Sequence, residues 1–292
     1  MARKNFSNGT ALGSAYRMGA AATIDTPNEG GIPAQTEPPK ADSVTLRLEK
    51  RTHLDQARYK ATLYNYAPGL AEIGWSFIPS LLPAKAGRGE SVNRALNEDR
   101  AVRRARSKLR RKILAAQADH LLTLTYRENI VDFNQASTDL NRFVRIVKSQ
   151  LPNWIYIAVA EHQERGAWHW HMAVKGRQDV VFLRSTWRHV VGEGNIDVRP
   201  PKGSGRYRLL GLVRYLGKYL AKGFGDNDHA LNARRFRSSL GIVIPSQTLS
   251  VPKESYSDVK GFALSVLRGT AGTNGFSWQS DDGQSGWACS WK

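Results

Sequence analysis

The stretch WIYIAVAEHQERGAWHWHMAV, residues 154–174, decides the fold class. Its two ends, WIYIAVAE (154–161) and AWHWHMAV (167–174), are rich in β-branched and aromatic residues, and a short polar turn containing Gly166 separates them. Two such runs joined by a glycine-containing turn are typical of an antiparallel β-hairpin. We therefore expect a hairpin at the centre of this part of the chain.

The segment before the hairpin supplies a strand and a helix. In HLLTLTY (120–126) leucine alternates with threonine, which is the period of a strand with one buried face. A helix is then predicted to begin at Asp132. Its apolar residues recur at three- and four-residue spacing, namely Phe133, Ala136, Leu140, Phe143 and Val147.

The segment after the hairpin repeats this order. A second helix has the apolar stripe Val180, Leu183, Trp187 and Val190, and the short strand NIDVRP (195–200) follows it. The predicted order β-α-β-β-α-β indicates an α+β fold, a ferredoxin-like antiparallel sheet with helices on one face. A third helix is predicted over residues 208–222.

The rest of the chain is less regular. Residues 1–45 are predicted to be a flexible N-terminal arm, 46–99 an extension of uncertain structure, and 100–117 a basic helix. The α+β domain is assigned to 118–225, and 226–292 is predicted to be a poorly ordered C-terminal extension.

The charge of the chain indicates a polyanionic partner. Lysine and arginine number 43 against 25 acidic residues, for a net charge of +18, and nucleic acid is the leading candidate. No apolar run is long enough to span a bilayer, so no membrane partner is expected. The single cysteine, Cys289, excludes an internal disulfide, and the basic start lacks an apolar signal-peptide core. A cytoplasmic location is therefore expected.

The densest positive charge is RAVRRARSKLRRK, residues 100–112, which contains no glycine or proline. It predicts a basic helix that contacts DNA phosphates, and a merely solvated helix face is the compatible alternative. The residues expected to bind DNA are Arg100, Arg103, Arg104, Arg106, Lys108, Arg110, Arg111 and Lys112.

The hairpin contains a candidate metal site. His169 and His171 are two residues apart and project to one face of their strand, while Trp168 and Trp170 project to the other. Glu161 lies on the neighbouring strand at an even offset and reaches the same surface if the pairing is regular. Two imidazoles and a carboxylate suit Mg²⁺ or Mn²⁺, with Zn²⁺ as an alternative. The competing interpretation is that the histidines are ordinary polar strand residues.

The third helix contains candidate nucleophiles. Tyr215, Lys218, Tyr219 and Lys222 fall within one sector of the helix, next to a sector of leucines. A tyrosine acts as a nucleophile only if positive charge stabilises its phenolate or a base removes its proton, and nearby lysines or a metal provide such help. The alternative is amphipathic packing, with the lysine side chains extending to water.

Three motifs together resemble the HUH endonucleases, specifically the rolling-circle replication initiators of single-stranded DNA phages and plasmids. They are LLTLTY (121–126), EHQERGAWHWHMAV (161–174) and YLGKYLAK (215–222), and the resemblance covers about 105 of the 292 residues. The resemblance implies that His169, His171 and Glu161 bind the metal. It also implies that Tyr215 and Tyr219 are the nucleophiles, assisted by Lys218 or Lys222.

The activity implied by the resemblance is nicking and rejoining of single-stranded DNA at a replication origin. A tyrosine attacks a phosphodiester, giving a 5′-phosphotyrosine and a free 3′-OH that a host polymerase extends. Since the chain has no phosphate-binding loop of the ATPase type, a host helicase is the expected further partner. A transposase of the same superfamily is an enzymatic alternative.

A non-enzymatic alternative is a module that binds single-stranded nucleic acid on exposed aromatic residues of the sheet. Burial of Trp168 and Trp170 under the helices favours the enzyme, and their exposure favours the binding module. Specific DNA recognition is assigned first to residues 100–112. Further candidates are the C-terminal tail and the basic residues before the third helix, Arg199, Lys202, Arg206 and Arg208.

Overall fold

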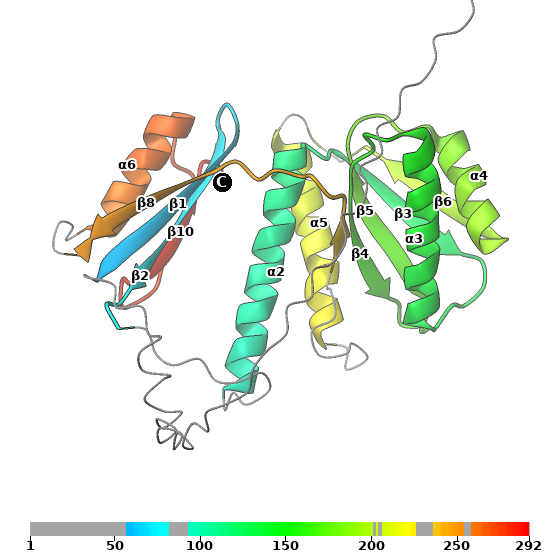
Figure 1. Ribbon diagram of the computed structural model, residues 1–292, viewed down its shortest axis with the longest axis horizontal. Helices are drawn as coiled ribbons and strands as arrows, with labels where there is room; N and C mark the ends of the chain where they lie inside the picture. Colours follow the sequence, from blue (N-terminus) through cyan, green and yellow to red (C-terminus); the bar gives the residue numbers. More distant parts are fainter. Residues whose placement is uncertain are drawn as a thin grey trace, which may run out of the picture. The chain divides into compact units, whose positions relative to one another are not determined.

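The computed structural model describes residues 57–81, 93–200, 203, 206–225, 236–253 and 258–291. The predicted N-terminal arm, residues 1–45, lies outside them. The described elements include two five-stranded antiparallel sheets (Figure 1). We name them sheet A, with strand order β8-β1-β2-β10-β9, and sheet B, with strand order β6-β3-β5-β4-β7.

Sheet B has the predicted β-α-β-β-α-β order. The predicted hairpin is present as β4 and β5, and β5 pairs on its other side with β3. The helices are α3 (Phe133–Gln150) and α4 (Val180–Val191). The strands are β3 (His120–Tyr126), β4 (Tyr156–His162), β5 (Trp168–Val174), β6 (Gly194–Arg199) and β7 (Arg237–Ser238).

Helices α3 and α4 begin at aspartates that cap them. The Asp132 side chain accepts hydrogen bonds from the backbone N–H groups of Asn134 and Gln135, and Asp179 accepts one from that of Phe182. Such caps satisfy N–H groups that have no partner inside a helix. The apolar stripes of both helices then pack in one core cluster with residues of β3 and β5. The prediction of helices on one face is confirmed for these two.

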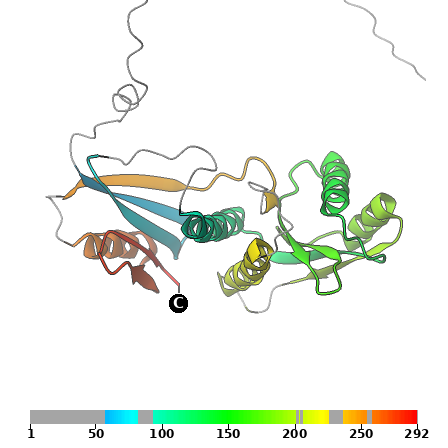
Figure 2. The same cartoon turned by 90° about the horizontal axis from the view of Figure 1, so that it is seen from below.

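The other face of sheet B is covered in part by α5 (Arg206–Gly225) and α2 (Arg94–Ala116). Leu212, Leu216 and Leu220 of α5 share a core cluster with Ile157 and Ala173 of the sheet. Leu109 and Ile113 of α2 belong to the same cluster. Figure 2 shows α2 and α5 side by side. This packing brings α5 to the face on which the two histidines lie.

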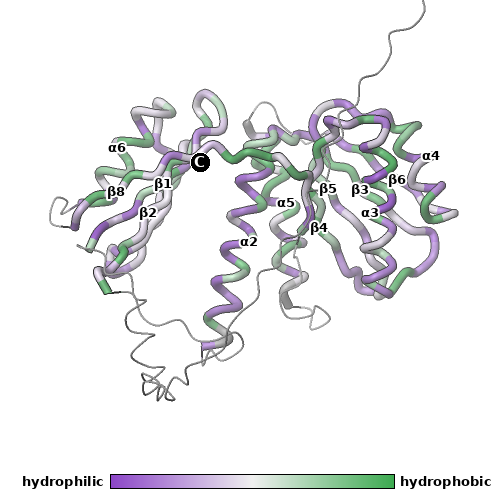
Figure 3. The backbone as a smooth tube through the Cα atoms, viewed as in Figure 1, coloured by the Kyte–Doolittle hydropathy of each residue, from purple (hydrophilic) through white to green (hydrophobic). Residues whose placement is uncertain are grey.

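Helix α2 contains the basic run and is hydrophilic along most of its length (Figure 3). The helix predicted over residues 100–117 is therefore present and begins several residues earlier. Among the described residues, no helix combines the length and the apolar character needed to cross a bilayer.

Sheet A corrects the prediction that residues 226–292 are poorly ordered. The segment contributes β8 (Ser246–Pro252), β9 (Ser277–Gln279), β10 (Ser285–Cys289) and α6 (Val259–Ala271). These strands pair with the hairpin of β1 (Arg58–Ala67) and β2 (Leu70–Ile78). The sequences of these strands are short, and their order comes from pairing with strands that are distant in the sequence. Helix α6 packs on one face of this sheet.

Candidate active site

The pairing of β4 with β5 brings a carboxylate beside two imidazoles. Glu161 lies directly opposite His169, and His171 is two residues farther along β5. Cross-strand neighbours project to the same face of a sheet. The Nε2 atom of His171 lies 2.7 Å from Oε2 of Glu161, and both imidazoles are buried. Glu161 therefore lies on the same face of the sheet as the two histidines, as expected from the sequence.

The hydrogen bonds of His171 determine which of its nitrogens holds a proton. Because an ionised carboxylate only accepts hydrogen bonds, Nε2 of His171 donates to Glu161. The other nitrogen, Nδ1, then accepts from the hydroxyl of Thr123, at 3.2 Å. Burial lowers the pKa of His171, against the opposing effect of Glu161. The neutral imidazole, which is the form that binds metals, is favoured.

His169 has different neighbours. Its Nδ1 lies 3.2 Å from Nε2 of Gln163, and its Nε2 lies 3.5 Å from Nη2 of Arg165. Burial lowers the pKa of His169, and the nearby His171 and Arg165 lower it further. Its imidazole is therefore also held in the neutral form.

The described residues contain no group of three His, Cys, Asp or Glu side chains placed to hold a metal ion. The donor chemistry nevertheless fits a divalent cation, with two neutral imidazoles and one carboxylate on paired strands. Since one lone pair cannot serve both a guanidinium and a metal, His169 has to leave Arg165 to join such a site. The side chains fit the metal in type and face, but each histidine has to give up a present hydrogen bond to bind it. His171 is included, because its Nε2 donates to Glu161 and its Nδ1 accepts from Thr123.

Two phenol rings of α5 lie against His171. The ring of Tyr219 stacks on the imidazole, with centroids 4.4 Å apart, and the ring of Tyr215 meets it edge-on at 5.5 Å. The two tyrosine hydroxyls are 3.3 Å apart and share a hydrogen bond. Tyr215 is 37% exposed, so a molecule in solvent can reach it. The structure thus brings both candidate nucleophiles together with the histidine and the glutamate.

The surroundings of Tyr215 oppose its ionisation. Burial raises the pKa of its phenol, and the hydrogen bond to Tyr219 and the negative charge of Glu161 raise it further. Arg199 acts in the opposite direction. A nucleophilic role for Tyr215 consequently requires an added positive charge, such as a metal ion or a cation brought closer by the substrate.

The two candidate lysines differ in how closely they approach the site. The Nζ atom of Lys222 lies 3.9 Å from Oε1 of Glu161, which brings an ammonium group to the carboxylate. The Nζ atom of Lys218 lies 5.9 Å from the centre of the Tyr219 ring. Both side chains are exposed at this surface. Lys222 is therefore the lysine nearer to the proposed metal ligands.

Three residues of the basic run have partners inside the protein. Arg110 and Arg111 each donate through Nε to Glu72, at 2.8 Å and 2.7 Å, and the carboxylate of Glu72 is fully buried. Lys112 donates to Ser238 of β7 at 2.9 Å. These three cations hold elements together, a role that charge density alone did not reveal. The remaining five are exposed, namely Arg100, Arg103, Arg104, Arg106 and Lys108.

The residues before α5 are described only in part. Arg199 is exposed and close enough to Tyr215 to affect its pKa, and Arg208 donates to the backbone oxygen of Gly203. Lys202 and the side chain of Arg206 lie outside the described residues.

Three neighbours of the histidines were not predicted from the sequence, namely Thr123, Gln163 and Arg165. Gln163 and Arg165 belong to the turn of the hairpin, and Thr123 lies opposite His171 on β3. The alternation of threonines in 120–126 was a usable signal for Thr123, but the register between β3 and β5 was needed to apply it.

The two tryptophans that distinguish the enzyme from a binding module are buried. Trp168 is 2% exposed and Trp170 is 1% exposed, and the indole of Trp170 donates to the backbone oxygen of Ala136 in α3. They face the helices and leave the opposite face to the histidines. The observation that would favour base stacking on sheet B is therefore not met.

A comparison with family models connects this arrangement to DNA replication. A search of curated proteins and a search of solved structures each found no match. The model of a family described as "Replication-associated protein ORF2" matches residues 119–224. That span contains β3 to β6 of sheet B and every candidate site residue from Glu161 to Lys222. Residues 119–224 are thus similar to a replication-associated protein, consistent with a replication initiator.

Proposed function

We propose that the protein is a replication initiator of the HUH type, which nicks and rejoins single-stranded DNA at a replication origin and so starts rolling-circle replication of a phage or plasmid. One observation carries the proposal. Two tyrosines of α5 lie against His171, which is hydrogen-bonded to Glu161, within the segment that matches a replication-associated family.

In the proposed reaction a tyrosine oxygen attacks the phosphorus of a phosphodiester. A bond forms between the phenol oxygen and phosphorus, and the bond from phosphorus to O3′ breaks. The phenol gives up its proton, and the leaving O3′ takes one up and becomes a free hydroxyl. The product is a 5′-phosphotyrosine, and attack by a 3′-hydroxyl reverses the step and rejoins the strand.

The residues around the tyrosines have complementary parts in this proposal. His169, His171 and Glu161 would hold Mg²⁺ or Mn²⁺, which when bound polarises the scissile phosphate. Lys222, 3.9 Å from Glu161, contributes positive charge close to the reacting phosphate, and Lys218 is the second candidate for this part. The positive charges of the metal and of the lysine favour the ionised phenol, which the surroundings of Tyr215 otherwise oppose.

The paired tyrosines favour an initiator over a transposase. Their hydroxyls are 3.3 Å apart, so both reach one phosphate position. While one tyrosine holds a 5′ end, the other is able to cut the displaced strand after a full circle. A single-tyrosine transposase of the same superfamily does not need this arrangement.

The proposed partners follow from the products and from the charge of α2. A host helicase separates the strands, and a host DNA polymerase extends the free 3′-OH. The exposed cations of the basic helix would contact DNA phosphates. They are Arg100, Arg103, Arg104, Arg106 and Lys108.

The experiment is a covalent adduct assay. Purified protein is incubated with labelled single-stranded DNA from its own replicon and Mn²⁺, and a denaturing gel is examined for a protein-linked band. The variants are Tyr215→Phe, Tyr219→Phe, the double variant and His171→Ala. The control is Tyr207→Phe, an exposed tyrosine in the first turn of α5.

We expect an adduct with the wild type and with Tyr207→Phe, and none with the double variant or with His171→Ala. Circular dichroism establishes that the inactive variants are folded. An adduct that survives in the double variant contradicts the tyrosine mechanism. Tight binding of DNA without an adduct in any divalent metal supports the non-catalytic binding module instead.

A further inference from the structure

Sheet A has one apolar and one polar face. On β1, Ala61 and Leu63 point to the core cluster that contains α6. Because side chains alternate along a strand, Lys60, Thr62 and Tyr64 point to the opposite face. This polar face has no part in the proposed nicking reaction, whose residues all lie on sheet B and α5.

One row of side chains crosses the polar face through all five strands. Gly74 in the middle of the row has no side chain, which leaves open space beside its cross-strand partner Trp287. The indole at the end of the row, that of Trp278, is 51% exposed. The row consists of Thr248, Thr62, Gly74, Trp287 and Trp278, each paired directly with the next.

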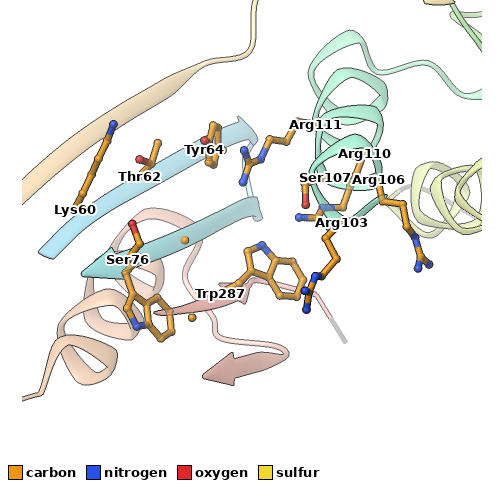
Figure 4. Close-up of a pocket in the computed structure, with 13 residues that line it drawn as sticks. Lys60, Thr62, Tyr64, Ser76, Arg103, Arg106, Ser107, Arg110, Arg111 and Trp287 are labelled. Carbon is orange, nitrogen blue, oxygen red and sulfur yellow. The ribbon is translucent and has the colours of Figure 1, made fainter. Parts of the chain in front are cut away.

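A cavity of about 570 Å³ lies between this face and helix α2 (Figure 4). The described residues that line it include no aspartate or glutamate. They include the hydroxyl-bearing residues Thr62, Ser76 and Ser107. The cavity therefore offers hydrogen-bond donors and positive charge. Its five cations are Lys60, Arg103, Arg106, Arg110 and Arg111.

Two of the arginines are held in place by contacts within the protein. The guanidinium of Arg111 lies 3.9 Å from the ring centre of Tyr64, and that of Arg110 lies 4.7 Å from the ring centre of Trp287. Both donate to the buried Glu72, whose single negative charge is outnumbered by the five cations of the cavity. The site is positive before any ligand arrives, and part of it is already ordered.

The positive surface continues beyond this cavity. An adjoining cavity of about 490 Å³ shares Arg103 and Arg111 with the first and adds Arg104 and Lys108. Cations that extend over two adjoining cavities fit a chain of phosphates better than one isolated anion.

We propose that the polar face of sheet A and helix α2 together form a second DNA-binding site, which binds single-stranded DNA independently of the nicking centre. The exposed arginines Arg103 and Arg106 of α2, together with Lys60, contact phosphates, and Trp278 stacks on an unpaired base. Exposed aromatic rings next to a positive groove favour single strands, because the base faces of a duplex are already covered by neighbouring bases. The proposal rests on the proposed function in one respect, that the exposed cations of α2 contact DNA, and adds the polar face of sheet A and Trp278 as the rest of the site; it does not require nicking.

The test measures binding of the full chain to fluorescein-labelled oligo-dT of about 20 nucleotides, a length several times one stacking site. The measurement is fluorescence anisotropy in EDTA, with every variant made in the Tyr215→Phe/Tyr219→Phe background, so that nicking plays no part. The test variant is Arg103→Ala/Arg106→Ala. The matched control is Arg145→Ala/Arg268→Ala, which removes two exposed arginines from α3 and α6.

We expect Arg103→Ala/Arg106→Ala to weaken binding by about tenfold or more and to reduce the salt dependence by one to two phosphate contacts. The control double variant stays within about twofold, since it only lowers the net charge. Trp278→Ala weakens binding by about fivefold or more, whereas Trp278→Phe retains most of the affinity because its ring still stacks.

Equal losses for the two arginine pairs would show that only net charge matters and would overturn the site. Unchanged binding in Trp278→Ala, together with equal affinity for a duplex of the same length, would overturn single-strand recognition. Binding of phosphatidylserine vesicles that Arg103→Ala/Arg106→Ala abolishes, with oligo-dT binding unchanged in the same variant, would overturn the site and assign the surface to a membrane. The adduct assay tests nicking separately from this binding measurement. A failure to nick therefore does not affect the proposed second site, and a failure of the second site does not affect the nicking proposal.

Discussion

The hydroxyls of Tyr215 and Tyr219 lie 3.3 Å apart, one turn from each other on α5, and both rings contact the imidazole of His171. Residues four apart on a helix lie on one side of it, so the helix itself positions the pair. Leu212, Leu216 and Leu220 hold that helix on sheet B. The spacing of the tyrosines and the packing of the leucines together determine where both phenols lie.

The first prediction concerns the division of labour between these tyrosines. Tyr215→Phe and Tyr219→Phe each leave one phenol beside His171, so each single variant still forms an adduct. Transfer between two intact oligonucleotides, neither of which has a free 3′-OH at the nick position, is expected to fall by about 100-fold or more. The second strand has to be cut by another nucleophile while the first 5′ end is still attached. The measurement is a strand-transfer assay on a denaturing gel. If one single variant performs strand transfer at the wild-type rate, the replaced tyrosine is not needed and only the remaining tyrosine is catalytic.

The second prediction concerns the carboxylate of Glu161. Glu161→Gln keeps the size of the side chain and removes the charge that faces His171 and Lys222. We expect affinity for Mn²⁺, measured by isothermal titration calorimetry, to fall by about tenfold or more. Thermal stability changes little, since the amide oxygen still accepts a hydrogen bond from His171. Glu164→Gln, in the exposed hairpin turn, is the control. Unchanged Mn²⁺ affinity in Glu161→Gln removes Glu161 from the metal site.

Metal removal gives a third result on the same centre. EDTA is expected to abolish the adduct without unfolding the protein, because both buried histidines are neutral and have hydrogen-bond partners within the protein. Excess Mg²⁺ or Mn²⁺ restores it. Full adduct formation in EDTA contradicts the metal-dependent mechanism.

The fourth prediction concerns Glu72, the buried partner of two arginines. Glu72→Gln leaves Arg110 and Arg111 next to each other without a counter-charge, and we expect the free energy of unfolding to fall by about 3 kcal/mol. Urea denaturation followed by circular dichroism measures this change. Glu128→Gln, an exposed glutamate after β3, alters the same charge and is expected to cost less than about 0.5 kcal/mol. A loss no greater than that of the control would mean that the ion pairs contribute nothing.

The fifth prediction concerns pH and Asp119. Burial acts to raise the pKa of this carboxyl, but hydrogen bonds with His120 and with the backbone N–H of Gly176 outweigh it and lower the pKa below 3.8. The ionised carboxylate therefore stabilises the folded protein above about pH 4, and this stabilisation is lost as the pH falls through the folded-state pKa. Asp119→Ala should lower the free energy of unfolding by about 1 kcal/mol at pH 7 and by less near pH 3. Equal losses in thermal unfolding at both pH values contradict this account.

The sequence predicts sheet B well because its signals are local. The hairpin, both capped helices and the common face of the two histidines depend on residues close together in the chain. The position of Thr123 could not be predicted, because its pairing with His171 depends on the register of two strands 48 residues apart. Likewise, nothing local separates Arg110 from Arg106, and the internal partners of Arg110, Glu72 and Trp287, are distant from it in the sequence.

Sheet A could not be predicted for a different reason. Strand β8 reads SQTLSVP, in which only Leu249 and Val251 alternate with polar residues, and β10 reads SGWAC, which has no clear alternation. Their order depends on the hairpin of β1 and β2, far away in the sequence. Short polar segments gain a defined structure only when such a partner supplies the hydrogen bonds.

The pairing in sheet A also determines when it can form during protein synthesis. The backbone N–H of Ala71 donates to the hydroxyl of Ser290, 219 residues later, and β2 pairs with β10. At translation rates of about 5–20 residues per second, the β1–β2 hairpin waits roughly 10–40 seconds for these partners. An isolated hairpin is marginally stable in water, whereas the whole of β3 to β6 has emerged by then. We therefore expect β3 to β6 to fold before sheet A on the ribosome, while the edges of β1 and β2 stay unpaired in the nascent chain until β8 and β10 emerge.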